Sequence, residues 1–234
     1  LSAKVDRLTA DFAALKTAAA VARALGRETN SADWEVLAEK AHKTRLRWLW
    51  NDAEHFFYNA VQTEPHVIDD SCFIAGLAGD WALERSGIGS PLGPDLLARA
   101  SAATIARTVL ANGMTDQSGR PETPAFMQYA TAYLGAAALY GGQAEPAWRL
   151  MAVNDRVLTT PPSSHFIQGL TYESDGTHIS SLPYYMTAPA TWMFLEALAG
   201  LVFDAAVGYM KLAPAEGLQQ LPVFTTSSWF TLIR

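Results

Sequence analysis

The sequence is poor in cysteine, with Cys72 the only one among 234 residues. A single thiol excludes an internal disulfide and a zinc site made of several thiolates. The histidines His55 and His66 do not have the spacing of metal ligands. We therefore expect no metal site and no other cofactor, and we expect Cys72 to be a core residue.

Charged residues are also few, at 17% of the chain against ~25% in typical soluble domains. The net charge of −6 argues against a surface that binds nucleic-acid phosphates. No run of ~18 apolar residues occurs, so we expect no membrane span. No signal peptide precedes the first predicted helix, which favours a cytoplasmic location. Because Leu1 is not a methionine, we expect a processed product, a separate subunit or part of a longer chain.

Several catalytic motifs are missing as well. The sequence has no serine nucleophile elbow, no glycine-rich phosphate loop and no dinucleotide-binding fingerprint. These absences argue against most serine hydrolases, kinases and dehydrogenases. Half of the residues are hydrophobic, which excludes a disordered chain and predicts a buried core.

Apolar residues recur at helical spacing through most of the chain. The first predicted helix runs from Val5 to Leu25 and ends at Gly26. One of Asp69 and Asp70 is expected to cap the N-terminus of the third helix, and Asp80 of that helix is expected to face solvent. The same spacing predicts six further helices, approximately over residues 31–50, 70–86, 95–112, 124–141, 145–158 and 189–200.

The final segment has a different pattern. Residues 207–212, 222–225 and 229–233 are rich in aromatic and β-branched side chains and are separated by turn formers. They predict a small antiparallel sheet. We therefore divide the chain into a helical part, residues 1–204, and a β-strand tail, residues 205–234, packed on it.

Helices joined by short turns pack as antiparallel hairpins. The sequence thus predicts an all-α fold, an (α/α)6-toroid-like array of hairpins that forms part of a ring, closed by the β tail. A missing N-terminal segment or a partner chain is expected to complete the ring. The long polar connections 52–70, 113–128 and 159–187 are expected to meet on one side of it.

The connection 159–187 and the helix after it combine carboxylates with aromatic rings. Sugar-processing sites use carboxylates to move protons and aromatic faces to stack on pyranose rings. A plain alternative is a solvated loop whose tyrosines only anchor it. The candidate residues are Glu173 as a catalytic carboxylate and, as substrate contacts, Asp175, His178, Tyr184 and Trp192. Tyr184 and Trp192 are candidates for an apolar wall of the site, although we expect Trp192 to be packed under the loop.

Two other segments supply further candidates. Asp70 is the candidate for a second catalytic carboxylate. Gln128, Tyr129 and Glu122 belong to the connection 113–128 and the helix that follows, and they are candidates for substrate binding. That connection also has the composition of an ordinary polar turn.

The chain resembles glycoside hydrolase family 116, the family of non-lysosomal glucosylceramidase and bacterial β-glucosidases. Residues 72–81, CFIAGLAGDW, are similar to a Cys-Met-Ala-Asp-Gln-Leu-Ala-Gly-Gln-Trp helix of that family. Residues 170–174 and 185–189 are similar to its Gln-Thr-Pro-Glu-Ala and Tyr-Met-Arg-Pro runs, and the tail from Tyr209 is similar to its closing strands. The resemblance implies a toroid and glycosidase activity on a carbohydrate.

The resemblance places a sugar-contacting glutamate at Glu173 and leaves Ala75 where the family has its acid/base aspartate. The segments 169–173 and 181–185 are also similar to those of α-L-rhamnosidases, which implies a catalytic glutamate at Glu173. We expect hydrolysis of O-glycosyl bonds by carboxylate acid/base chemistry. Ala75 favours the alternative, a noncatalytic toroid domain that binds carbohydrate or another subunit. A plain helical scaffold is a third interpretation.

Overall fold

The structure is a computed structural model. The described residues are 54% helical and 22% strand, so the fold is mixed and the prediction of an all-α fold is wrong. None of the helices in the described part is both long and apolar enough to cross a membrane. The structure describes residues 2–111, 113–119, 125–161, 169–175, 178–182, 184–185, 188–204, 207–224 and 229–233.

A long β-hairpin accounts for most of the difference. Strands β3 (Phe56–Thr63) and β4 (His66–Phe73) pair antiparallel, with Thr63 opposite His66 next to the turn. They form the centre of a sheet in the order β1-β3-β4-β5, and β2 also pairs with β3. The outer strands are β1 (Ser2–Lys4), β2 (Trp50–Asn51) and β5 (Gln117–Ser118).

This hairpin corrects the predicted helix over residues 70–86. Asp69 and Asp70 lie within strand β4, so neither caps a helix. The chain becomes helical only at the short 3-10 turn η1 (Ile74–Leu77), and α3 (Ala78–Arg85) follows it. Cys72 is buried at the end of β4, as predicted.

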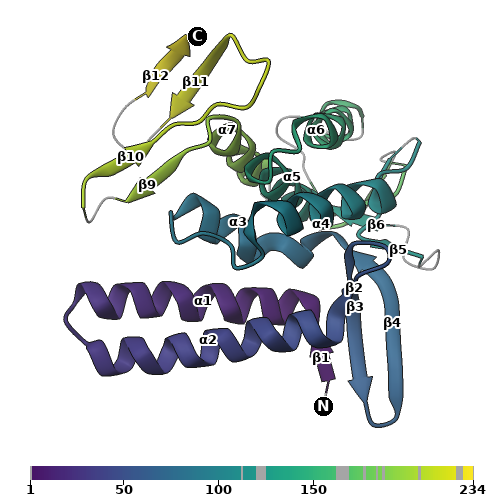
Figure 1. Ribbon diagram of the computed structural model, residues 1–234. Helices are drawn as coiled ribbons and strands as arrows, with labels where there is room; N and C mark the ends of the chain where they lie inside the picture. Colours follow the sequence, from purple (N-terminus) through teal and green to yellow (C-terminus); the bar gives the residue numbers. More distant parts are fainter. Residues whose placement is uncertain are drawn as a thin grey trace.

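The first two helices form an antiparallel hairpin beneath α3 (Figure 1). Helix α1 (Val5–Ala24) ends before Gly26, whose φ of 69° is the left-handed conformation that favours glycine. Helix α2 (Glu28–Leu49) begins three residues before Ser31, where the predicted helix starts. The Ser31 hydroxyl instead donates to the carbonyl of Ala19 at 2.9 Å and ties the two helices together.

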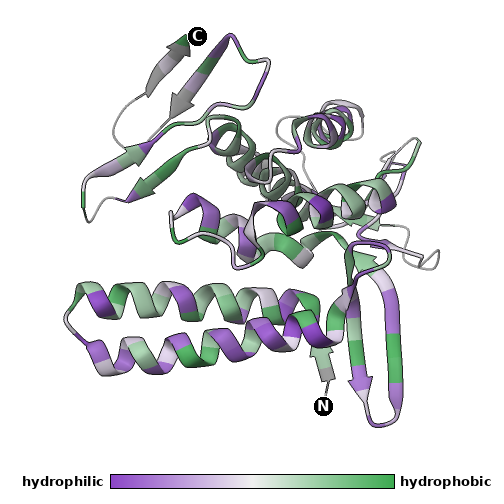
Figure 2. Cartoon of the chain, viewed as in Figure 1, coloured by the Kyte–Doolittle hydropathy of each residue, from purple (hydrophilic) through white to green (hydrophobic). Residues whose placement is uncertain are grey.

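Helix α5 (Gln128–Tyr140) is the centre of the remaining helices. It packs against α3, α4 (Gly93–Thr108), α6 (Ala144–Thr159) and α7 (Trp192–Leu198). Figure 2 shows the apolar composition of α5, and most of its side chains are buried. A helix that is apolar on all sides must be covered on all sides. One central helix surrounded by four others differs from the partial toroid of hairpins that the sequence predicts.

The strand tail is confirmed, although as two hairpins. Strand β9 (Val202–Asp204) pairs with β10 (Tyr209–Lys211), and β11 (Gln220–Phe224) pairs with β12 (Trp229–Ile233). Both pairs are antiparallel and lie beside α7 in Figure 1. Each is a separate two-stranded sheet.

A buried ion pair joins the helical hairpin to α3. The Arg45 guanidinium lies 2.8 Å from Asp80, and both side chains are almost inaccessible to solvent. Asp80 also accepts a hydrogen bond from Ser90 at 2.7 Å, and Arg45 lies over the ring of Phe57 at 4.1 Å. Asp80 therefore has a structural role and does not face solvent as predicted.

Candidate functional site

A three-stranded sheet positions Glu173. Strand β7 (Thr171–Glu173) lies between β6 (Ala125–Met127) and β8 (Ile179–Ser181). Phe126 and Tyr172 pair across β6 and β7, stack at 5.6 Å and are fully buried. Because side chains alternate along a strand, Glu173 lies on the opposite face, away from the core. Its side chain is 51% exposed.

Glu173 has two predicted neighbours in the turn that connects β7 to β8. Its carboxylate lies 3.5 Å from Nδ1 of His178, and its backbone N–H donates to the His178 carbonyl at 3.0 Å. Asp175 belongs to the same turn and is exposed. The structure thus brings these three residues together. A contact this exposed adds little to stability, and the half-exposed carboxylate of Glu173 is accessible to a ligand.

A second carboxyl group, that of Asp116, lies on the other edge of β6. The backbone N–H of Asp116 donates to the carbonyl of Ala125 at 2.8 Å, and its Oδ1 accepts the N–H of Met127 at 2.8 Å. Ala125 pairs with Glu173 on its opposite side. One short strand therefore fixes the backbone positions of both acidic residues.

Burial raises the pKa of Asp116 to about 7, while the hydrogen bond from the Met127 N–H partly opposes this shift. Removal of water penalises the charged form of a carboxyl group, so the neutral acid becomes stable near neutral pH. Strongly perturbed carboxyl groups of this kind are common at functional sites. Asp116 is thus the described carboxyl group best suited to carry a proton at pH 7.

Segments far apart in the sequence meet at this sheet. The Asp116 carbonyl accepts the N–H of Ile74, the residue before Ala75, at 2.9 Å, and the N–H of Met114 donates to the carbonyl of Ser174 at 2.7 Å. These contacts bring the connections 113–128 and 159–187 together, although not on the rim of a toroid as predicted.

The third connection, 52–70, belongs mostly to the β3–β4 hairpin. This hairpin reaches the same region at its end, where Cys72 of β4 pairs with Ser118 of β5.

Three aromatic rings from α3 and α5 form a row, and Tyr129 at one end of it is electrostatically coupled to Asp116. Trp81 of α3 lies 5.4 Å from Tyr133 of α5, and Tyr133 lies 6.0 Å from Tyr129 on the preceding turn. The Tyr129 hydroxyl lies 2.7 Å from the sulfur of Met127. We call Trp81, Tyr133 and Tyr129 the aromatic row. All three are partly exposed, as a surface that stacks on a sugar ring requires.

The aromatic row ends close to Asp116. The pKa of Tyr129 is raised, mainly by burial and further by the charges of Asp116, Tyr133 and Tyr185. Electrostatic coupling of this kind requires that Tyr129 and Asp116 lie near one another. Tyr129, a predicted substrate contact, is therefore part of the site.

Four other predicted site residues are not assembled with Glu173. Gln128 is fully buried as the first residue of α5. Asp70 is exposed on β4, and no contact in the described ranges connects it to Glu173. Tyr184 is 75% exposed. Trp192 is 69% exposed at the start of α7, so its predicted packing under the loop is wrong. Glu122 lies outside the described residues.

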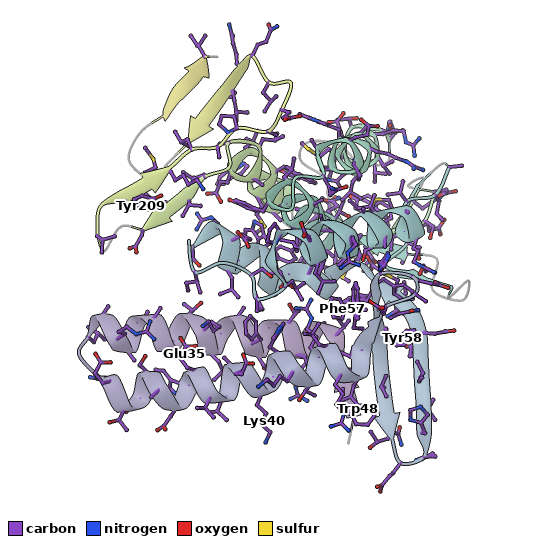
Figure 3. The ribbon with its side chains drawn as sticks, in the orientation of Figure 1. Glu35, Lys40, Trp48, Phe57, Tyr58 and Tyr209 are labelled. Atoms are coloured by element: carbon purple, nitrogen blue, oxygen red, sulfur yellow. The ribbon has the colours of Figure 1, made fainter. Side chains whose placement is uncertain are left out.

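A separate groove lies along α2. It encloses about 640 Å³, and its walls are the side chains of a single helix, including Glu35, Lys40 and Trp48. Figure 3 shows Lys40 pointing away from the rest of the molecule. A groove on one helix with mixed charges has no convergent catalytic groups, so we place the candidate site at β6 and β7.

Within the described ranges, no three His, Cys, Asp or Glu side chains are arranged to hold a metal ion. Sequence reasoning missed Asp116, whose only signal is an acidic residue in a polar loop after a helix.

Comparisons with known proteins give no family for the chain. No family model matches the sequence, and no curated protein matches it either.

Proposed function

We propose that the chain is a glycoside hydrolase that acts on O-glycosyl bonds, with Glu173 as a catalytic carboxylate. The observation that carries the proposal is the position of Glu173 on β7. The opposite face of this strand is packed in the core, so its backbone is held in place. The carboxylate itself is open to solvent and to ligands.

The expected chemistry follows from this position. The oxocarbenium-like transition state of glycoside hydrolysis needs a fixed carboxylate beside the anomeric carbon or an attacking water. Glu173 is suited to accept the proton of that water. The imidazole of His178 lies 3.5 Å from the Glu173 carboxylate, and a protonated imidazole at this distance stabilises the charged carboxylate.

The aromatic row supports a carbohydrate as the substrate. Pyranose rings present apolar C–H faces, and partly exposed Trp and Tyr rings bind such faces. Tyr129 and Tyr133 present their rings one helical turn apart on α5, at a spacing of 6.0 Å. The row thus offers an apolar platform at the side of β6.

The test is hydrolysis of 4-nitrophenyl glycosides by the wild-type chain and by Glu173→Gln. The panel contains the β-D-glucoside and the α-L-rhamnoside, the two sugars that the sequence resemblance implies. Glutamine keeps the shape of the side chain and removes its charge. We expect the variant to lose at least ~10² in turnover. The matched control is Glu64→Gln, which changes an exposed residue at the tip of the β3–β4 hairpin and is expected to keep the parental rate.

A noncatalytic sugar-binding domain is the second candidate. Ala75 in η1 supplies no carboxyl group, and the 51% exposure of Glu173 also suits a hydroxyl acceptor. Such a domain would bind the glycosides without cleaving them. Glu173→Gln would then weaken binding in calorimetry, and no nitrophenol would be released by either protein.

A further inference from the structure

We infer that Asp116 is the proton donor of the reaction and forms a catalytic pair with Glu173 across strand β6. This inference rests on the proposed function. It assigns a role to a residue that the sequence patterns did not indicate. Asp116 bonds to Ile74, the residue before Ala75, and Ala75 itself has no carboxyl group to donate a proton.

Hydrogen bonds hold both the main chain and the carboxyl group of Asp116. Its backbone N–H and carbonyl are hydrogen-bonded to Ala125 and Ile74, and its Oδ1 accepts the N–H of Met127. These three bonds fix both the main chain and the carboxyl plane. Among the described residues, no hydrogen bond engages Oδ2. That oxygen is the one available to hold the proton.

The surroundings of the Asp116 carboxyl group favour its neutral form. The groups that bond to Asp116 come from η1 and β6, and Tyr129 of α5 is the titratable group of the described residues that is coupled to it. In the described part of the chain, no cation lowers the pKa of Asp116. Burial therefore dominates, and the group keeps its proton up to about pH 7.

In the proposed step, Asp116 donates a proton and Glu173 accepts one. The proton on Oδ2 of Asp116 moves to the glycosidic oxygen, and the bond between this oxygen and the anomeric carbon breaks, leaving its electron pair on the departing alcohol. A water molecule adds its oxygen to the anomeric carbon and gives a proton to Glu173. Asp116 ends ionised and Glu173 ends protonated. Exchange with solvent then restores both groups.

The position of the two residues also indicates the stereochemistry. They flank β6 on opposite edges, and two strand spacings of ~4.8 Å place their backbones roughly 10 Å apart. A water molecule fits between carboxyl groups that are about 6.5–9.5 Å apart, whereas a covalent mechanism uses about 5–5.5 Å. The proposed step has no covalent intermediate, with Asp116 as acid and Glu173 as base, and it therefore inverts the anomeric centre.

The experiment compares leaving groups in wild-type protein and Asp116→Asn. Asparagine keeps an oxygen that accepts the Met127 N–H but cannot donate a carboxylic proton. The probes are the 2,4-dinitrophenyl and 4-methoxyphenyl glycosides of the sugar that the wild-type chain hydrolyses in the panel above. The 2,4-dinitrophenolate leaves without protonation, whereas 4-methoxyphenolate needs an acid. Circular dichroism verifies that the variant is folded.

We expect Asp116→Asn to lose at least ~10² in kcat/KM on the 4-methoxyphenyl glycoside and only a few-fold on the 2,4-dinitrophenyl glycoside. Asp33→Asn, an exposed change on α2, is the matched control and is expected to lose nothing on either probe. An equal loss on both probes, or no loss, overturns the role of Asp116 while the proposed function stands. A wild-type chain that hydrolyses no glycoside overturns the proposed function and this role together.

Carbon-13 NMR of the aspartate carboxyl groups gives a readout that does not depend on activity. We expect one signal that titrates near pH 7 in the wild-type chain and disappears in Asp116→Asn. If all aspartate signals titrate below pH 5, Asp116 cannot be the neutral acid at pH 7, and the inference is wrong.

Discussion

Asp116 and Glu173 contact opposite edges of one strand residue, Ala125. The N–H of Asp116 donates to the Ala125 carbonyl, and Glu173 is the antiparallel partner of Ala125 in β7. The two acidic residues are 57 positions apart in the sequence, yet three residues of β6 set their relation. Any change in the pairing of β6 is therefore expected to alter both at once.

The raised pKa of Asp116 predicts how stability depends on pH. The folded chain keeps this proton up to about pH 7, whereas the unfolded chain releases it near its ordinary value. The contribution is therefore fully present below about pH 4 and is lost as pH rises through about 7. We expect the free energy of unfolding to fall by ~2–4 kcal/mol from this group between pH 4 and pH 8.

Urea denaturation at several pH values measures this effect, with Asp116→Asn as the comparison. The neutral amide does not titrate, so the difference in stability between variant and wild type should grow in favour of the variant as pH rises. A constant difference between pH 4 and pH 8 would show that Asp116 has an ordinary pKa in the folded chain.

The buried pair of Arg45 and Asp80 predicts a large effect of a single substitution. Asp80→Asn leaves the Arg45 guanidinium buried without its counter-ion, and we expect a loss of about 3–5 kcal/mol in the free energy of unfolding. The double variant Arg45→Met, Asp80→Leu removes both charges and should recover most of that loss.

Glu39→Gln is the control for this prediction. It breaks an exposed pair between Glu39 and Lys43 on α2, which is expected to contribute less than about 1 kcal/mol. Equal losses for Asp80→Asn and Glu39→Gln in urea denaturation would contradict the structural role of the buried pair.

The close approach of α3 to α1 depends on Gly79. A Cβ atom at this position would lie 2.1 Å from the backbone carbonyl oxygen of Thr9, which cannot rotate away. We expect Gly79→Ala to lower the free energy of unfolding by at least ~1–3 kcal/mol. Gly76→Ala is the matched control, because its Cβ would meet only a side-chain methyl of Val5 at 3.3 Å. Similar melting temperatures for the two variants would refute this packing.

The aromatic row predicts a loss of binding without a loss of chemistry. Tyr133 lies between Trp81 and Tyr129, so Tyr133→Ala removes the middle of the platform. We expect KM to rise by roughly 3–10-fold, equivalent to about 0.5–1.5 kcal/mol for one aromatic contact, with little change in kcat. Trp148→Ala on the exposed face of α6 serves as the control. A fall in kcat with unchanged KM would place Tyr133 in the chemistry instead.

The helices were largely predictable because their apolar spacing is local. The boundaries of α1, α4 and α6 lie within a few residues of the predicted ones. The β3–β4 hairpin was not predictable in this way, because an aspartate before an apolar run is also typical of a helix cap. In the structure, Asp69 accepts hydrogen bonds from Ser71 and from Asn59 on the neighbouring strand. Strand pairing outweighed the local helical pattern there.

The candidate site was only partly predictable for a related reason. Glu173, Asp175 and His178 are close in the sequence, so their proximity follows from one turn. The environment of Asp116 is built by Ile74, Ala125 and Met127, which come from separate segments. The same dependence on tertiary contacts explains why the buried Asp80 looked like a surface residue.

The most direct test of the account is proton NMR of the sugar released in the first minutes of hydrolysis. The wild-type chain should release the anomer opposite to that of the substrate glycoside, because the proposed step uses Asp116 as the acid and Glu173 as the base without a covalent intermediate. Glu173→Gln should release none in the same time. Release of the retained anomer would contradict the pairing across β6, and the absence of any released sugar from the wild-type chain would contradict glycoside hydrolysis itself.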